Sequence, residues 1–190
     1  MTGVPATLDA RFRAAAAATG DLDVAYDVLD DTPVGTLLVG VSERGLCRVH
    51  FDPDPERELD DLARRFGPRV LRSPSAIDRA KLELDEYFSG KRHAFDLELD
   101  LRGTPDFYRQ VLAELARVEY GTTTTYGTLA ARVGAPKAAR AVGTVMNRNP
   151  IPIVLPCHRV VGSTGSLVGY AGGLDRKRTL LELEGALLGG

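Results

Sequence analysis

The sequence predicts an α+β protein with two domains, an antiparallel β-meander with helices followed by a helical domain. Three short segments within 23–52, separated by turn residues, are typical of strands joined by tight turns, and apolar residues alternate with polar ones through 47–51. Apolar residues recur at helical spacing after residue 104, and Gly103-Thr104 separates the two patterns. The predicted domains are therefore 23–103 and 104–190, preceded by an N-terminal extension at 1–22.

Three strands are predicted to open the N-terminal domain, at 23–30, 36–42 and 46–52. Turns at Pro33-Val34-Gly35 and Arg44-Gly45 join them into a meander. In the third strand the alternation places Cys47 on the inward face, where a structural thiol is expected. The Ala-rich segment 7–19 is either a short helix or irregular, and it is assigned no function.

Two amphipathic helices are predicted next, near 55–66 and 75–88. The second has one apolar face, formed by Ile77, Ala80, Leu84, Tyr87 and Phe88. Beyond it, apolar residues alternate with acidic ones through 95–101, which predicts a half-buried strand with Phe95, Leu97, Leu99 and Leu101 on its inner side.

The second domain is predicted to begin with a helix that Thr104 caps, with Pro105 in its first turn and its end near Val118. Its inward stripe is Phe107, Val111, Leu115 and Val118. A final helix near 175–184 is expected to end at Gly185.

Between them, a helix from Tyr126 to Val133 and a second from Pro136 to Asn147 flank the turn Gly134-Ala135, which predicts a helix-turn-helix. The second helix should pack inward through Ala139, Val142, Gly143 and Met146. Its outer face, Lys137, Arg140, Ala141 and Thr144, is basic and built of small residues, so that it can approach a nucleic-acid groove closely.

Charge is distributed unevenly along the chain. Residues 1–104 hold 14 Lys/Arg and 20 Asp/Glu, a net charge of −6, whereas residues 105–190 hold 10 and 6, a net charge of +4. A basic half suggests a polyanionic partner that the acidic half would avoid.

Residues 149–160 read Asn-Pro-Ile-Pro-Ile-Val-Leu-Pro-Cys-His-Arg-Val, and Cys157 is one of only two cysteines. The thiolate is the reactive form of cysteine, and a neighbouring His can lower the pKa of the thiol, so Cys157 is a candidate nucleophile. Pro156 favours the turn that Cys157 and His158 need in order to communicate. For an isolated Cys-His pair, a buried structural Cys beside a surface His is the commoner situation.

The segment 156–161, Pro-Cys-His-Arg-Val-Val, resembles the active-site signature of the O6-alkylguanine-DNA alkyltransferases, the methylated-DNA–protein-cysteine S-methyltransferases. Further motifs follow the family's order and spacing, at 126–130, 136–143, 149–150, 169–174 and 180–185. The resemblance covers 105–186 closely and 23–104 loosely. It implies a ribonuclease H-like N-terminal domain and a C-terminal DNA-binding domain.

The activity that the resemblance implies is DNA repair by direct reversal. A methyl or alkyl group would move from O6 of guanine to Cys157 in one irreversible turnover, because a thioether is a poor leaving group. His158 matches a family His that acts through a bridging water, and Glu184 matches the Glu that orients it. Tyr126 matches the Tyr that donates to the guanine ring of a nucleotide flipped out of the duplex.

The same resemblance assigns binding residues. Arg140 matches the arginine finger that fills the space left by the flipped base, with a plain phosphate contact as the alternative. Asn149 matches the link between the helix-turn-helix and the active-site loop. The substrate pocket is matched by Val160, Tyr170, Ala171 and Gly172, with Ala171 standing where the family often has a hydroxyl residue. Arg159 is expected to be a structural or ion-pairing residue.

Double-stranded alkylated DNA is the expected partner, bound by a protein that is monomeric in solution and can line up in several copies along DNA. No cofactor is expected. The N-terminal half offers only Cys47, His50 and His93 as soft metal ligands, so no metal is expected. No apolar run approaches the ~18 residues of a membrane span and no signal peptide is recognised, which favours a cytoplasmic protein whose Cys157 stays reduced.

Three other functions remain open at this point. A damage sensor of the alkyltransferase-like type would bind the lesion without removing it, but such proteins carry another residue, often Trp, where this chain has Cys157. A cysteine hydrolase would use Cys157, His158 and Glu184, although hydrolases usually bring Cys and His from distant segments. A transcription regulator would use the helix-turn-helix alone.

Overall fold

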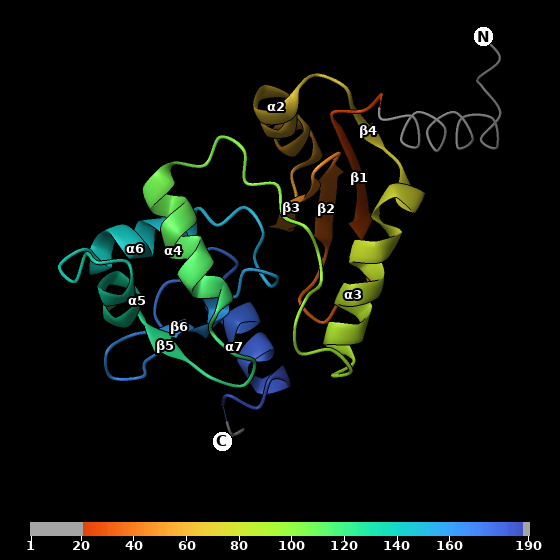
Figure 1. Cartoon of the computed structure of the whole chain (residues 1–190). Helices are drawn as coiled ribbons and strands as arrows, with labels where there is room; N and C mark the ends of the chain where they lie inside the picture. Colours follow the sequence, from red (N-terminus) through yellow and green to blue (C-terminus); the bar gives the residue numbers. More distant parts are fainter. Residues whose placement is uncertain (1–20, 188–190) are drawn as a thin grey trace, which may run out of the picture. The chain divides into compact units, whose positions relative to one another are not determined.

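The computed structural model describes residues 21–187, so the predicted segment 7–19 lies outside the described residues. The chain folds into two compact units (Figure 1). Described residues up to Asp85, together with Asp96–Arg102, form the first unit, and Glu86–Phe95 together with the chain from Gly103 onward form the second. The segment Glu86–Phe95 thus belongs with the second unit, although it precedes the boundary expected near residue 103. No helix within 21–187 has the length and apolar character needed to cross a membrane.

Three strands of the first unit form the predicted antiparallel meander: β1 (Val24–Leu29), β2 (Leu37–Ser42) and β3 (Gly45–Phe51). A fourth strand, β4 (Val70–Arg72), pairs with β1 in parallel, so the sheet has the order β3-β2-β1-β4. The sequence does not predict β4, because three residues are too few to show a period of two.

The helices of the first unit are α2 (Pro55–Phe66) and α3 (Asp78–Phe88), with a 3-10 turn η1 (Pro74–Ile77) in place of the first predicted turn of α3. The sheet and α2 share a buried core of Val24, Leu38, Cys47 and Leu62. Cys47 is fully buried, as predicted, and burial raises the pKa of its thiol to about 12, which makes it unreactive.

The predicted strand at 95–101 is wrong. The segment makes only an isolated parallel bridge between Leu99 and Leu46, in which the backbone of Leu46 donates to and accepts from the residues flanking Leu99 at 2.8 Å. The alternation ends at Asp100, which turns inward because Arg102 binds its carboxylate at 2.7 Å. The carboxylate of this ion pair is buried, whereas the Arg102 side chain is 33% exposed, so Asp100 departs from the outward placement expected for the acidic residues.

Three helices pack together in the second unit, α4 (Asp106–Ala116), α5 (Tyr126–Arg132) and α6 (Ala139–Asn147) (Figure 1). The last two form the predicted helix-turn-helix, and the turn between them contains Gly134 at a φ of 73°. The inward side of α4 is buried at the predicted positions Val111 and Leu115.

The predicted cap of α4 is wrong. The helix begins at Asp106, and Pro105 occupies the N-cap position with an extended ψ of 151° and without a side-chain cap. Thr104 therefore lies one residue too early to cap the helix.

The predicted start of α6 is also wrong by three residues. Pro136 and Lys137 lie in a turn, closed by a 2.8 Å hydrogen bond from the Ala138 N–H to the Ala135 carbonyl, and α6 begins only at Ala139. Pro136 favours this tight turn as much as a helix start, because both require the same φ.

Two short strands, β5 (Thr124–Thr125) and β6 (Val160–Val161), pair in parallel and bring the start of α5 beside the segment after Cys157. The last helix is α7 (Leu174–Leu183), which agrees with the prediction near 175–184. Gly185, at a φ of 69°, lies just beyond it.

Candidate active site

Cys157, His158 and Arg159 form a single 3-10 turn, η2 (Cys157–Arg159). The prediction of a turn here is confirmed, and the carbonyl of Pro156 accepts the N–H of Arg159 at 2.9 Å. The apolar segment before the turn is almost wholly buried. Cys157 keeps 4% of its surface exposed, whereas His158 keeps none. The thiol therefore lies at the margin of an otherwise closed protein interior.

Asn149 ties the end of α6 to the loop before Cys157. Its Nδ2 donates to the Leu155 carbonyl at 2.8 Å, and its Oδ1 accepts the Ile151 N–H at 3.1 Å. Between the two backbone groups that Asn149 contacts, Ile153 has a φ of 74°, a conformation that is rare and costly for a β-branched residue. Burial of Ile153 and the two amide contacts of Asn149 fix the shape of the loop.

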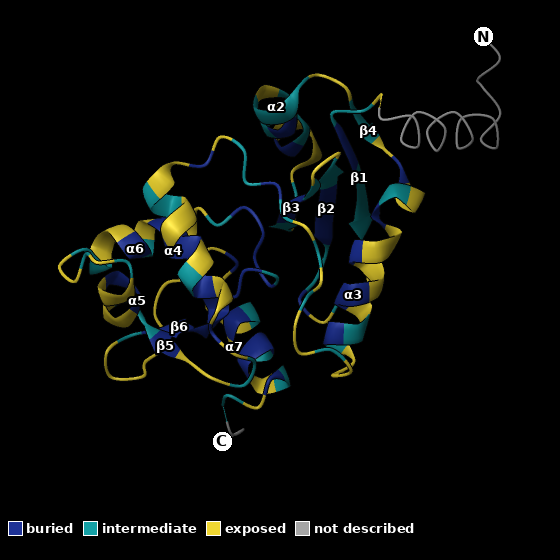
Figure 2. Ribbon diagram, in the orientation of Figure 1, coloured by how far each residue is buried: buried dark blue, intermediate teal, exposed yellow. Residues whose placement is uncertain are grey.

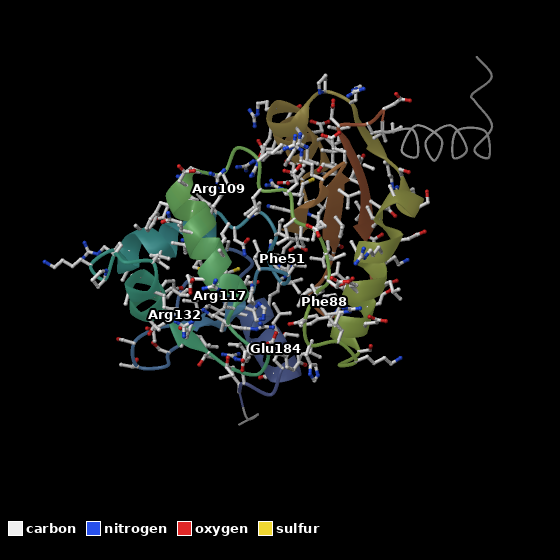
Figure 3. All side chains as sticks on the ribbon, viewed as in Figure 1. Phe51, Phe88, Arg109, Arg117, Arg132 and Glu184 are labelled. Atoms are coloured by element: carbon white, nitrogen blue, oxygen red, sulfur yellow. The ribbon has the colours of Figure 1, made fainter. Side chains whose placement is uncertain are left out.

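Glu184 lies at the C-cap of α7 (Figure 3). Its exposed fraction is 5%. Its Oε1 bonds His158 Nε2 at 2.9 Å. Arg159 forms a bidentate ion pair with the same carboxylate, through Nη2 at 2.8 Å and Nε at 2.9 Å, and also donates to the Val118 carbonyl. The prediction that Arg159 is an ion-pairing residue is confirmed.

These contacts fix the protonation of His158. Burial acts to raise the pKa of Glu184, but hydrogen bonds from His158 and Arg159 outweigh it and lower the pKa to about 2. An ionised carboxylate can only accept, so the proton of a neutral His158 lies on Nε2 and Nδ1 carries a lone pair. Nδ1 is buried and has no hydrogen-bond partner among the residues that the structure describes. Burial also lowers the pKa of His158, so the imidazole is a neutral base.

Cys157 differs from the sequence-based expectation of a lowered pKa. Burial raises the pKa of the thiol, and hydrogen bonding by Asn149 and Tyr170 opposes that rise only in part. The pair Cys157–His158 is therefore a neutral thiol beside a neutral imidazole. Such a pair must transfer its proton as the thiol reacts, rather than before.

Tyr126 begins α5 directly after β5, and the pairing of β5 with β6 brings it close to η2. Its hydroxyl donates to the carbonyls of Val168 and Gly169, each at 3.3 Å. Burial raises the pKa of Tyr126, and a thiolate at Cys157 would raise it further. A hydroxyl held in its protonated form is a hydrogen-bond donor rather than a base.

The predicted pocket residues differ in exposure. Tyr170 is partly buried and near enough to Cys157 for its hydroxyl to affect the thiol's pKa. Ala171 is exposed, and Gly172 is buried with its carbonyl accepting from Arg176 Nη1 at 3.0 Å. Val160 is fully buried in β6, so its side chain is not on the accessible surface.

Lys177 is a buried cation that the sequence analysis did not single out. Its side chain is fully buried, and Nζ donates to the carbonyls of Val160 at 2.6 Å and Val168 at 3.0 Å. It thereby ties α7 to both ends of the loop at 162–167. A signal was available, because Lys177 occupies the same stripe of α7 as the buried Leu180, Leu181 and Glu184.

The outer face of the helix-turn-helix is exposed as predicted (Figure 2). Its members Lys137, Arg140, Ala141 and Thr144 are all exposed, while the opposite side buries Val142 and Met146. Val145 is buried as well, so the inward face is wider than the predicted stripe. Among residues 21–187, no group of three His, Cys, Asp or Glu side chains is arranged to hold a metal ion.

Two family models match this chain. The 6-O-methylguanine DNA methyltransferase ribonuclease-like domain matches residues 24–101, and the DNA binding domain of the same family matches residues 106–186. Both parts of the chain are thus recognised, in the order that the sequence analysis expected.

Relatives agree with these matches. The chain is 54% identical over 154 residues to the methylated-DNA–protein-cysteine methyltransferase of Mycolicibacterium paratuberculosis, covering 81% of this chain and 88% of that protein. Identity to the protein of the same name from Methanosarcina barkeri is 42%, over 84% of this chain and 96% of that one.

Among solved structures, Mycobacterium tuberculosis OGT in complex with DNA aligns with a TM-score of 0.74 and 41% identity, over 85% of this chain and 92% of that one. The motif around Cys157, both family models and relatives at this identity agree, and the chain belongs to the methylated-DNA–protein-cysteine methyltransferase family.

Proposed function

We propose that this protein repairs DNA by direct reversal, moving a methyl or alkyl group from O6 of guanine to its own Cys157. Family membership supports the reaction class. The observation that carries the residue assignment is the 2.9 Å contact between His158 Nε2 and Glu184, because it leaves the Nδ1 lone pair free on the imidazole that follows Cys157 in the chain.

The reaction balances with the groups at hand. The thiol proton moves to His158 Nδ1, through a bridging water, while sulfur attacks the alkyl carbon. The C–S bond forms, the C–O6 bond breaks, and the electron pair stays on the guanine, which takes a proton from the Tyr126 hydroxyl. Solvent returns the proton from His158 to Tyr126. A thiol and an O6-alkylguanine have then become a thioether and guanine.

The product is a dead end. A thioether is a poor leaving group, and the second cysteine, Cys47, is buried in the core of the other unit. One protein molecule therefore performs one turnover and is consumed.

Double-stranded alkylated DNA is the proposed partner. The exposed basic face of the helix-turn-helix supports it. Lys137, in the turn before α6, and Thr144 would contact the backbone, Ala141 would allow close approach, and Arg140 would enter the space left by the flipped guanine. The pocket that receives the guanine is assigned to Asn149, Tyr170, Ala171 and Gly172, while the side chain of Val160 is fully buried and does not line it. We further propose that the protein is a cytoplasmic monomer that can occupy DNA in several copies.

Mass spectrometry tests the transfer. After incubation with duplex DNA containing O6-methylguanine, one added methyl should appear on the peptide that contains Cys157, with a stoichiometry of one. Cys157→Ala should bind the same DNA without accepting a methyl, and Cys47→Ala should behave like the wild type.

A methyl group found on another residue would refute the assignment of Cys157. Equal behaviour of the wild type and Cys157→Ala would instead favour the damage sensor. Hydrolysis of a thioester substrate with multiple turnovers would favour a cysteine hydrolase.

A further inference from the structure

We propose that Tyr87, which lies 70 residues before the nucleophile, is a positioning residue for the reaction at Cys157, acting through Glu184 on His158. Tyr87 Oη donates to Glu184 Oε1 at 2.7 Å, and His158 Nε2 bonds this same oxygen at 2.9 Å. The inference rests on the proposed function, because it assigns a further residue to that reaction.

The hydroxyl of Tyr87 is held in one place. Its ring is fully buried among three aromatic neighbours, with centroid distances of 5.5 Å to Phe88, 5.3 Å to Phe95 and 6.1 Å to Tyr120. Burial and the negative charge of Glu184 both raise the pKa of Tyr87, so its hydroxyl stays protonated and donates. A rigid aromatic ring therefore delivers a fixed donor to the carboxylate.

Tyr87 completes the set of donors around the carboxylate. Oε1 accepts from Tyr87, His158 and Arg159, while Oε2 accepts from Arg159 and, at 3.4 Å, from the Gly121 N–H. With both oxygens engaged from several directions, the carboxylate cannot rotate away from His158. The orientation of the imidazole, and with it the Nδ1 lone pair, depends on this restraint.

The Tyr87 hydroxyl also weakens the electrostatic effect of the Glu184 carboxylate on His158. A donor on Oε1 takes up part of the carboxylate's negative charge, which otherwise favours the imidazolium form. The other charges that act on His158 are Arg159 and Lys177, both of which disfavour the imidazolium. Loss of the Tyr87 hydroxyl would leave these two unchanged, so the pKa of His158 should rise.

The position of Tyr87 in the chain has a structural consequence. It lies in Glu86–Phe95, the segment that precedes the family's DNA-binding region yet belongs to the second unit. This segment is then part of the reactive unit rather than only a connection to it.

Tyr87→Phe tests the proposal, because it removes one oxygen and keeps the ring. Tyr120→Phe is the matched control: its ring lies in the same cluster, but its hydroxyl donates to the Leu183 carbonyl at 3.0 Å. The measurement is the rate of single-turnover methyl transfer to O6-methylguanine DNA as a function of pH. His158 must be neutral to accept the thiol proton, so the acid limb of this profile reports its pKa.

For Tyr87→Phe we expect the acid limb to move to higher pH and the plateau rate to fall by about tenfold, as for the loss of one charge-assisted hydrogen bond. Tyr120→Phe should keep the wild-type profile. In a Glu184→Gln background, Tyr87→Phe should have no further effect, because the two residues act in series.

An unchanged acid limb in Tyr87→Phe, with an active wild type, would overturn this inference alone. A wild type that accepts no methyl group would overturn the proposed function instead. If Tyr87→Phe does not fold, the hydrogen bond between Tyr87 and Glu184 can still be tested in the wild type by NMR. The Tyr87 hydroxyl proton should exchange slowly and resonate downfield in NMR spectra, and exchange as fast as that of an exposed tyrosine would refute the contact.

Discussion

Glu184 is a buried carboxylate whose ionised form is held by donors from separate parts of the chain. His158 and Arg159 reach it from η2, and Tyr87 reaches it from the end of α3. Replacing a buried, paired charge leaves its partners without compensation, which costs several kcal/mol in general. Single residues of this cluster should therefore affect both stability and reactivity.

The pH dependence of stability follows from the same carboxylate. The pKa of Glu184 falls from 4.5 to about 2 on folding. A depressed carboxyl pKa means that the unfolded chain binds more protons, so this contribution is fully present above pH 4.5 and is lost as the pH falls towards 2. Its size is about 3 kcal/mol.

Urea denaturation across this window provides the measurement. The free energy of unfolding of the wild type should fall steeply between pH 4.5 and pH 2. In Glu184→Gln the same decrease should be smaller by about 3 kcal/mol. Other carboxylates contribute equally to both proteins and cancel in the comparison. Identical pH dependence in the two proteins would contradict the ionised state of Glu184.

At the scale of elements, α7 supports the active site through two residues on one stripe. Glu184 orients His158 at one end of the helix, and Lys177 binds the carbonyls of Val160 and Val168 near the other. The second of these carbonyls also accepts from Tyr126. Lys177 thus holds in place the loop that Tyr126, the proposed donor to guanine, contacts through its hydroxyl.

Lys177→Met should loosen this loop. The buried Val160 carbonyl loses a donor at about 1–3 kcal/mol, whereas the Val168 carbonyl keeps its contact with Tyr126. Removal of a buried ammonium offsets part of the loss, so we expect a net destabilisation of about 1 kcal/mol. Hydrogen exchange of the backbone amides in 162–169 should accelerate. Lys137→Met is the matched control, because Lys137 is exposed and its replacement should change stability by less than about 0.5 kcal/mol. Equal effects of the two substitutions would contradict the bracing role of Lys177.

At the scale of the whole molecule, charge separates the two halves of the chain. The first 104 residues carry a net charge of −6, and the remainder carries +4. DNA binding that releases counterions from phosphates depends on salt only through the cations that contact the DNA. The basic half should therefore account for the whole salt dependence.

Binding of the Cys157→Ala protein to duplex DNA at several salt concentrations tests this distribution. Adding Lys137→Met should reduce the slope of log K against log salt by about 0.9, the value for one phosphate contact. Adding Arg57→Met, which removes an exposed cation from α2 in the acidic half, should leave the slope unchanged. A slope that responds only to Arg57 would place the DNA on the other unit.

The sequence by itself determined the features that depend on local chemistry. The strands β1, β2 and β3 with their turns, the faces of α6, and the turn at Cys157 follow from local residue patterns and from Pro156, because a strand, a helix and a turn each favour particular residues at particular spacings. The family motifs predicted the family, which both family models confirm, and they supplied the residues that we propose to be reactive.

Only the tertiary structure decided what depends on residues far apart in the chain. It paired β4 with β1 and β5 with β6, turned Asp100 inward, and brought Tyr87 and Lys177 to the reactive unit. Tyr87 looked like an ordinary apolar residue of a helix face, because a local pattern does not say which distant carboxylate a hydroxyl will meet. Burial likewise set the neutral state of Cys157 and His158, since desolvation is a property of the whole surrounding structure and not of the neighbouring residues in sequence.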